Sequence, residues 1–217
     1  HRDFARAFER ALVRAGLPVA YSSGFHPHPR ISFAGAAPTG AASEAEYLEV
    51  GLGTVSEPEL VRDALDRAMP DGLDVVAVTG SSGRSLAELL EASRWRVEVP
   101  GLSTEAAAAA VRRFLEQESV RVERMTKKGV RSFDCRAAVV SLAVGQHVGE
   151  TGKCAILDLV LRHGTPSVRP DDVLAGVRTI AGLEAGPAPI HERLAQGPLD
   201  PRTGTVGDPL TPHRDTG

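Results

Sequence analysis

The chain has 217 residues, 42% of them hydrophobic, which is enough for one large domain or two small ones around a real core. Its formal net charge of −3 argues against a protein that binds nucleic acid over its whole surface, so any such surface has to be local. Two cysteines without a CxxC pair argue against a zinc or iron–sulfur site built by this chain alone. The sequence shows no signal peptide and no apolar run of the roughly 20 residues that span a bilayer, which predicts a cytoplasmic protein with no membrane partner.

The first part of the chain predicts two helices and three strands. Phe4, Phe8 and Leu12 recur at helical spacing, and Gly16 ends this helix. The other expected elements are a strand over residues 31–34, a strand over 46–52, a helix capped by residues 56–59 and a strand over 73–78. The chain starts inside a helix without Met, so we expect the natural polypeptide to begin earlier. One strand before His1 would complete the β-α-β-β-α-β order of the ferredoxin-like split motif.

The second part of the chain has the same mixture of helices and strands. The expected elements are a short helix over 86–92, a strand over 93–99, a helix over 104–118 capped by Ser103, a hairpin of 120–125 with 132–144, a strand over 155–161 and a helix over 169–181. From Pro187 the chain is rich in proline and glycine, so beyond a short ordered stretch near Ile190 we expect a disordered tail. The prediction is an α+β protein with two ferredoxin-like subdomains, residues 1–80 and 85–186, the first lacking its N-terminal strand, and a flexible tail over 187–217.

Residues 21–47 form an unusually long connector that is rich in proline, glycine, histidine and aromatic residues. Such connectors usually bind something when they are not disordered. In an extended segment His26 and His28 point to the same side, so both could meet one metal ion. A carboxylate such as Glu44 or Glu46 could then complete the ligand shell. The favoured alternative is that the histidines cap loop carbonyls and stack on neighbouring rings, because a metal site needs three or four convergent ligands.

The segment RVERMTKKGVRSFDCR, residues 121–136, is the second candidate for function, because its basic residues stand out in an acidic chain. Lys127, Lys128 and Arg131 are expected at the hairpin tip, where they could contact phosphates as point charges, and Phe133 offers a stacking surface. A solvated hairpin tip is the alternative. A second set of basic residues lies within the first helix and the connector: Arg2, Arg6, Arg10, Arg14 and Arg30.

The opening segment HRDFARAFERALVRAGLPVAYSSGFHPHPRISFAGAAPTGAASEAEYLEV closely resembles the start of the radical-SAM-linked, or radical-SAM-associated, family. This family is a bacterial domain of unknown function, found as a separate protein or fused behind a radical S-adenosylmethionine domain. The segments LAELLEASRW and KKGVRSFDCRAAV extend the resemblance to about residue 180. The family motif G-F-x-P-H-P-[KR]-[IL]-S-F is matched by Gly24, Phe25, Pro27, His28, Pro29, Arg30, Ser32 and Phe33. His26 occupies the variable position, which weakens the two-histidine metal site and directs attention to His28.

The family has no established biochemical activity to carry over. From the basic segments and the resemblance together we predict a non-catalytic accessory module that presents RNA, transfer or ribosomal, or a protein substrate to a radical SAM enzyme. The chain lacks the CxxxCxxC motif of a radical SAM enzyme, so S-adenosylmethionine and the iron–sulfur cluster would belong to the partner, and we expect no cofactor in this chain and no reading of DNA sequence. The expected binding face consists of Arg2, Arg6, Gly24, Phe25, His28, Arg30, Lys127, Lys128 and Arg131. One alternative is a metal-independent ribonuclease that uses His28 with Tyr21 or Tyr47. Another is a protein–protein adaptor.

Overall fold

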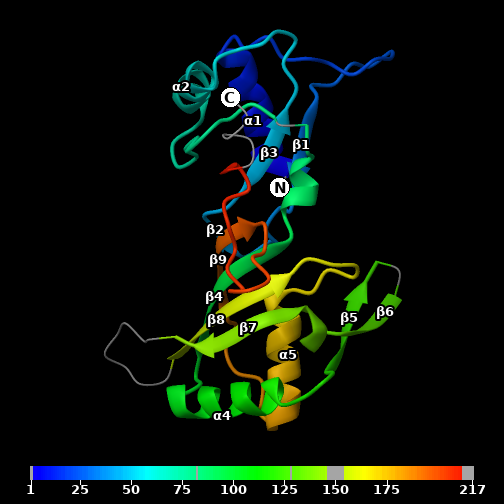
Figure 1. Cartoon of the computed structure of the whole chain (residues 1–217), viewed down its shortest axis with the longest axis vertical. Coiled ribbons are helices and arrows are strands. Elements are labelled where there is room, and N and C mark those ends of the chain that lie inside the picture. The colour runs from blue at the N-terminus through cyan, green and yellow to red at the C-terminus, as the bar shows by residue number, and fades with distance from the viewer. Residues whose placement is uncertain (1, 82, 128, 146–153, 212–217) are drawn as a thin grey trace. The chain divides into compact units, whose positions relative to one another are not determined.

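Helices and strands mix along the chain, which confirms the predicted α+β class (Figure 1). The computed structural model describes residues 2–81, 83–127, 129–145 and 154–211. The chain forms two compact units. Unit 1 consists of His1–Thr39, Glu46–Leu89 and Pro209–Gly217, and unit 2 consists of Gly40–Ala45 and Leu90–Asp208. No helix in the described ranges is both long enough and apolar enough to cross a membrane.

Unit 1 packs two helices against a two-stranded antiparallel sheet. Its elements are α1 (Arg2–Arg14), β1 (Ile31–Ala34), β3 (Tyr47–Val50), α2 (Pro58–Ala68) and the short α3 (Leu86–Leu89). The apolar stripes of α1 and α2 meet in a cluster around Phe8, Leu12 and Leu65, as the helical spacing predicts. Phe33 of β1 lies directly opposite Leu48 of β3, and Leu48 packs against that cluster. Pro58 is at the first turn of α2, where its missing N–H costs no hydrogen bond.

The strand predicted over residues 73–78 is not formed, and these residues run as unpaired extended chain. Val75 and Val78 pack on the apolar cluster of unit 1, and the Val75 N–H donates to Asp66 Oδ1 at 2.8 Å. A strand needs a neighbouring backbone to hydrogen-bond with, and the sheet of unit 1 has only β1 and β3 among the described residues. Val75 and Val78 are therefore partly buried without sheet pairing.

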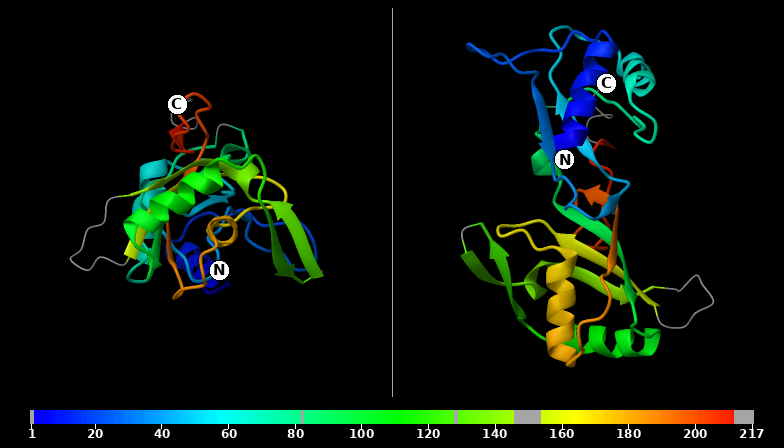
Figure 2. Two further views of the ribbon diagram at one scale, coloured as in Figure 1. Left: turned by 90° about the horizontal axis from the view of Figure 1, so that it is seen from below. Right: turned by 180° about the vertical axis from the view of Figure 1, so that it is seen from behind.

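Unit 2 is built on a five-stranded sheet, which Figure 2 shows from two further directions. Its strands are β2 (Ala42–Ser43), β4 (Ala92–Pro100), β7 (Val139–Val144), β8 (Cys154–Arg162) and β9 (Ile190–Gly197), in the order β2-β9-β4-β8-β7. All neighbours are antiparallel except β2 and β9. Trp95, Val97 and Val99 of β4 are buried on one face, as the predicted alternation requires.

Two long helices, α4 (Thr104–Leu115) and α5 (Pro170–Ala181), pack on each other and on the sheet. Ser103 caps α4 as predicted, because its Oγ accepts the Ala106 N–H at 3.2 Å. Phe114 of α4 is fully buried in the core between the helices and the sheet. The succession β4-α4-β7-β8-α5-β9 has the β-α-β-β-α-β order, with one hairpin inserted before β7. The ferredoxin-like assignment of the two units stays a prediction.

The inserted hairpin pairs β5 (Arg121–Thr126) with β6 (Gly129–Asp134), and the prediction that its second strand runs on to residue 144 is wrong. The chain turns after β6 through a 3-10 helix, Arg136–Ala138, and β7 then joins the other sheet. Asp134 holds this turn, since its Oδ1 accepts the N–H groups of Val120 at 3.0 Å and Arg136 at 2.9 Å. Burial raises the pKa of Asp134, but these hydrogen bonds outweigh it and lower the pKa overall.

The short ordered stretch expected near Ile190 is the strand β9, Ile190–Gly197, which lies between β2 and β4. The residues of β9 that face inward are largely polar, so no apolar alternation marks it as a strand. His191, Arg193 and Gln196 are all buried. Leu199, further along, packs with Ala92 and Val160 in a second small cluster.

A buried polar network joins β9 to β4 in unit 2. The Arg193 guanidinium lies 5.5 Å from the Trp95 ring centroid and donates to Ser43 Oγ at 3.1 Å. Gln196 Nε2 donates to the Ala45 carbonyl at 2.6 Å, which ties the segment before β3 to this strand. Arg193 and Gln196 thus each have specific partners, which the cost of burying a polar group requires.

Trp95 connects this network to a histidine. Its Nε1 donates to Ser93 Oγ at 2.8 Å, and the same oxygen lies 3.1 Å from His163 Nε2. His163 Nδ1 lies 2.7 Å from the Leu90 carbonyl, so Nδ1 carries the proton and Nε2 accepts from the serine hydroxyl. Burial, helped by the charge of Arg193, lowers the pKa of His163 against the opposing effect of the Leu90 carbonyl. Ser93 is only 3% exposed, whereas His163 also reaches the surface of unit 2, so the pair joins the end of the buried network to the surface.

The substitution Gly176→Ala is expected to destabilise the protein by about 1–3 kcal/mol, because α5 approaches its neighbours too closely for a side chain there. An added Cβ would lie 2.8 Å from Cys135 Sγ and 3.0 Å from Val120 Cγ1. Urea unfolding followed by circular dichroism measures the change. Gly164→Ala is the matched control, since nothing lies within 4 Å of its Cβ position. Equal stability of the two variants would contradict the close packing.

Acid is expected to destabilise unit 2 partly through His163. The lowered pKa of His163 means that the folded state prefers the neutral ring. The contribution of His163 to the free energy of unfolding is therefore complete above the ordinary pKa of 6.5 and is lost as the pH falls through the lower pKa of the folded state. Unfolding free energies of the wild type and His163→Gln are compared between about pH 7.5 and about pH 5.5. The wild type should lose more stability over this range, while His28→Gln, in unit 1 and outside the contacts of His163, should behave like the wild type. A His163→Gln protein with unchanged pH dependence contradicts this role.

Candidate functional site

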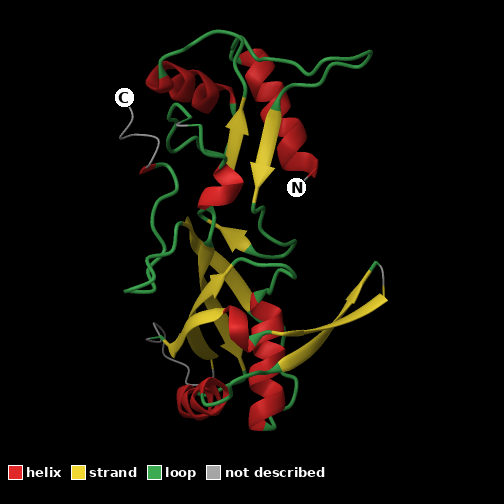
Figure 3. Ribbon diagram, turned by 45° about the vertical axis from the view of Figure 1, so that its right-hand side comes forward, coloured by secondary structure: helices red, strands yellow, loops and turns green. Residues whose placement is uncertain are grey.

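The connector after α1 forms a projecting hairpin, residues 20–30, which we name the finger (Figure 3). Tyr21 and Pro29 form a bridge across it, and the Ser22 N–H donates to the His28 carbonyl at 2.9 Å. The Ser22 side chain accepts the His28 N–H at 3.0 Å, so the two sides of the finger are joined twice at one level. Gly24, with φ +128°, makes the turn at the tip, a conformation that side chains rarely adopt. The finger is therefore an ordered element and not a loose loop.

The base of the finger is hydrogen-bonded to Gly51, the residue that follows β3 in unit 1. The Ala20 N–H donates to the Gly51 carbonyl, and the Gly51 N–H donates to the Arg30 carbonyl, both at 2.8 Å. A Cβ at Gly51 would lie 3.2 Å from Arg30 Cβ, so glycine permits this close approach. The sheet thus holds the base while the tip extends away.

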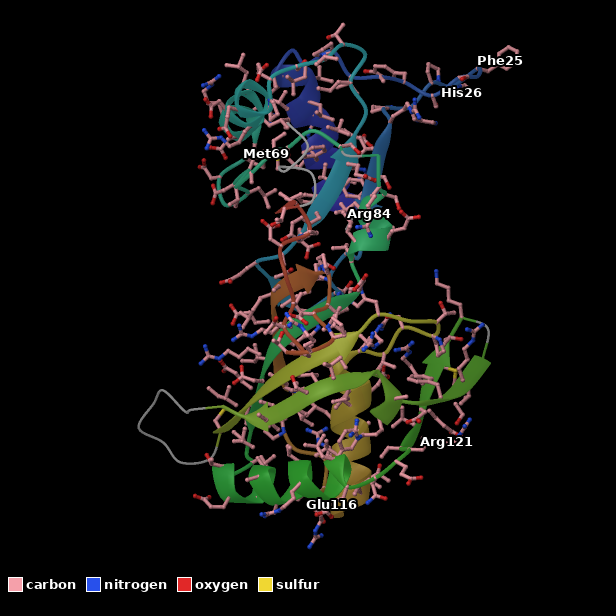
Figure 4. All side chains as sticks on the ribbon, in the orientation of Figure 1. Phe25, His26, Met69, Arg84, Glu116 and Arg121 are labelled. Carbon is pink, nitrogen blue, oxygen red and sulfur yellow. The ribbon has the colours of Figure 1, made fainter. Side chains whose placement is uncertain are left out.

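The tip of the finger carries an aromatic ring that packs on nothing. Phe25 is 103% exposed, and Tyr21, closer to the base, is 54% exposed. Figure 4 shows Phe25 and His26 at the far end of the finger, pointing away from the helices of unit 1. His28 and Arg30 are exposed as well. A large exposed apolar group on a fixed element is typical of a surface that binds a macromolecule, because burial in a partner recovers its hydrophobic free energy.

The alternative metal and catalytic residues do not gather at one place in unit 1. The two histidines, His26 and His28, lie on the finger, whereas Glu44 lies in unit 2 beside β9, where its N–H donates to the Arg193 carbonyl. Tyr47 is paired in the sheet opposite Ala34. Among the residues the structure describes, no three His, Cys, Asp or Glu side chains are grouped so that they could hold a metal ion.

The β5–β6 hairpin forms the second projecting element, which we name the arm, residues 121–134; it extends away from the five-stranded sheet (Figures 2 and 3). Its register places Val122 opposite Phe133 at the base, where both are buried. On the other face, nearer the tip, Met125 lies opposite Val130, and these are 74% and 57% exposed.

Arg124 anchors the arm to unit 2 and is not available to a ligand. Its Nη1 donates to Asp172 Oδ2 at 2.6 Å and its Nη2 donates to the Ser167 carbonyl at 3.0 Å. The guanidinium also lies 5.0 Å from the Phe133 ring centroid. Burial raises the pKa of Asp172, although the Arg169 N–H and the Arg124 charge act in the opposite direction. Sequence reasoning missed this role, because Arg124 looks like any other basic residue of the segment.

The remaining described basic residues of the arm are exposed. Arg121, Lys127 and Arg131 form no ion pair with other described residues, and Figure 4 shows Arg121 at the start of β5. Lys128, also expected at the tip, lies outside the described residues. The arm therefore offers positive charge beside an exposed apolar pair, which suits a partner with phosphates and flat apolar surfaces.

The predicted composite face draws on both units. Arg6 is exposed on α1 and belongs with the finger to unit 1, while the arm belongs to unit 2. Arg2 begins α1, but its side chain lies outside the described part. The joining of finger and arm into one face stays a prediction.

Cys135 is fully buried under α5. Burial raises the pKa of its thiol to about 11, and the charges of Asp134 and Asp172 act in the same direction. At neutral pH the group is therefore a thiol and a poor nucleophile.

The comparisons with known proteins give one family. Residues 1–170, well over half of the chain, match the family described as uncharacterized protein conserved in bacteria (DUF2344), and the match includes the finger and the arm. The search of curated proteins finds no match. The bacterial domain of unknown function that the sequence resembles is thereby supported, while its radical SAM association stays a prediction. The chain belongs to the DUF2344 family of uncharacterized proteins conserved in bacteria.

Proposed function

We propose that this chain is a non-catalytic binding module that presents RNA, such as transfer or ribosomal RNA, to a radical SAM enzyme. The observation that carries the proposal is the fully exposed Phe25 at the tip of a finger whose base is fixed by hydrogen bonds. Sequence-specific RNA recognition mostly uses unstacked bases of loops and ends, which stack on exposed aromatic rings. A base in a loop can stack on the face of Phe25, since every base has a π-face.

The arm supplies the second half of the proposal, because phosphates dominate the affinity of nucleic-acid binding. Lys127 at the tip and Arg131 opposite Arg124 are exposed on a ribbon that Arg124 ties to α5. Charges on an anchored ribbon lose less conformational freedom on binding than charges on a loose loop. With a net charge of −3 for the whole chain, this local cluster would orient an RNA toward the arm.

The proposal of a radical SAM partner rests on the sequence resemblance. In this proposal the partner contributes S-adenosylmethionine and the iron–sulfur cluster, and this chain contributes the binding surface.

The exposed Phe25 and the Met125–Val130 pair also favour a second candidate, a protein–protein adaptor, because each could fill an apolar pocket on a protein. The ribonuclease alternative needs His28 to act with Tyr21 on the finger, and the RNA assays below distinguish it.

The double variant Lys127→Glu/Arg131→Glu is expected to weaken RNA binding by roughly tenfold or more at low salt and to flatten its salt dependence. The loss of each phosphate contact reduces the slope of log affinity against log salt by about 0.7 for single strands. Fluorescence anisotropy with labelled transfer RNA at several salt concentrations measures both quantities.

Arg112→Glu/Arg113→Glu on α4 is the matched control, because it makes the same charge change at exposed residues of the same unit. This control should keep most of the affinity and the slope. If both double variants weaken binding equally, the effect is one of net charge and the arm is not the RNA site. If neither double variant changes the RNA affinity, the arm has no role in RNA binding.

Phe25→Ala is expected to weaken RNA binding by about 1–3 kcal/mol through lost stacking. The fold should be unaffected, because the ring is 103% exposed, and Val55→Ala, at a residue 105% exposed in the same unit, is the control. Anisotropy checks the loss of RNA affinity, and thermal unfolding checks that the fold is unchanged.

Full RNA affinity of Phe25→Ala together with lost co-purification of a protein partner would replace the proposal with the adaptor. RNA cleavage that His28→Ala abolishes would replace it with the ribonuclease.

A further inference from the structure

Unit 2 contains a cavity of about 310 Å³ between α4, α5 and the end of β4. The loop that follows α5, residues 182–189, closes one side of it. Apolar side chains form most of its wall: Val99, Val111, Leu157, Leu174, Val177 and Leu183. The space opens to solvent on one side, so a ligand that covers its apolar wall would release the water in contact with that wall.

One cation lies at the rim of this apolar space. Arg178, in the last turn of α5, is half-buried and lines the cavity, and its guanidinium has no hydrogen bond or ion pair with other described residues. Its main chain is held in place, because the Arg178 carbonyl accepts the Leu183 N–H at 3.0 Å. Gly182, with φ +66°, ends the helix at this point and turns the chain back over the cavity. The fold therefore places this charge beside an apolar space with no ion pair to another described residue, although the Glu184 carboxylate lines the same rim.

Two glycine turns shape the rest of the rim. Gly101 has φ +84°, and a Cβ there would lie 3.3 Å from Pro187 Cδ. A Cβ at Gly186 would lie 3.4 Å from the Pro100 carbonyl oxygen. The turn after β4 and the loop after α5 thus approach each other closely, which sets the size of the opening by backbone contact and not by mobile side chains.

We propose that this cavity binds a small amphipathic carboxylate, with its apolar body inside and its carboxylate on Arg178. An apolar cavity of about 150 Å³ accommodates benzene, so twice that volume suits a body of about ten to twelve carbons. A guanidinium binds a carboxylate through two parallel hydrogen bonds. Glu184, also at the rim, repels anions, which disfavours a multiply charged head group such as a phosphate. The cavity shares no residue with the finger or the arm, so this inference is independent of the proposed function.

Isothermal titration calorimetry with decanoate tests the inference, with decanol as the probe for the apolar part alone. The wild type should bind decanoate more tightly than decanol. Arg178→Met keeps the aliphatic stem and removes the charge, so it should weaken decanoate binding about tenfold and leave decanol unchanged. Arg113→Met, at an exposed position of α4 outside the cavity, is the matched control and should bind both like the wild type.

Methyl NMR spectra locate the bound molecule. Decanoate should shift the methyl signals of Val177 and Leu174, which line the cavity, and leave those of Val140, which belongs to a different cluster. No binding of decanoate by the wild type, equal affinity of Arg178→Met for decanoate, or shifts spread equally over Val140 and the cavity residues would each overturn the inference. Because Arg178→Met keeps the main-chain bond to Leu183 and changes only a side chain that makes no hydrogen bond to other described residues, folding does not limit the test.

Discussion

The burial of Arg193 in the sheet of unit 2 constrains more of the structure than any other interaction. A guanidinium is costly to bury unless hydrogen bonds and favourable electrostatics compensate it. Here Ser43 of β2, the Trp95 ring of β4 and Gln196 further along β9 all contribute. Three segments that are far apart in the sequence are thus held together by one polar side chain. The same requirement explains why the third segment, β9, is polar where an ordinary central strand is apolar.

The finger and the arm follow one design. Each is a hairpin whose base is tied to a packed unit while its tip stays exposed. The finger is held by Gly51, whose lack of a side chain allows Arg30 to approach, and the arm is held by Arg124 on Asp172. Residues of one chemical type therefore have different tasks: Arg124 stabilises the base of the arm, whereas Arg131, directly opposite it in the register, is exposed. Anchored tips lose little conformational entropy on binding, which favours recognition of a macromolecule.

The cavity of unit 2 differs from both hairpins in its chemistry. It is concave and apolar, with one cation at its edge, so it suits a small ligand, whereas the finger and arm are convex and suit a large one. The family match ends at residue 170, at the start of α5, and the residues of the rim that follow lie beyond it. The hairpins belong to the matched region, and Arg178 and Glu184 do not.

The sequence by itself determined the elements with strong periodicity and the exposed signature segments. The stripe of Phe8 and Leu12, the strand at Ile31–Ala34 and the cap at Ser103 were readable, because helical spacing, alternation and capping are local. The finger was also recognisable as a special connector from its composition. Only the tertiary structure decided that residues 73–78 form no strand, since strand formation depends on a partner backbone elsewhere in the chain. In the same way β9 is stabilised by polar contacts across the sheet, and Arg124 differs from Arg131 by its ion pair with Asp172. Neither feature can be recognised from the order of residues alone.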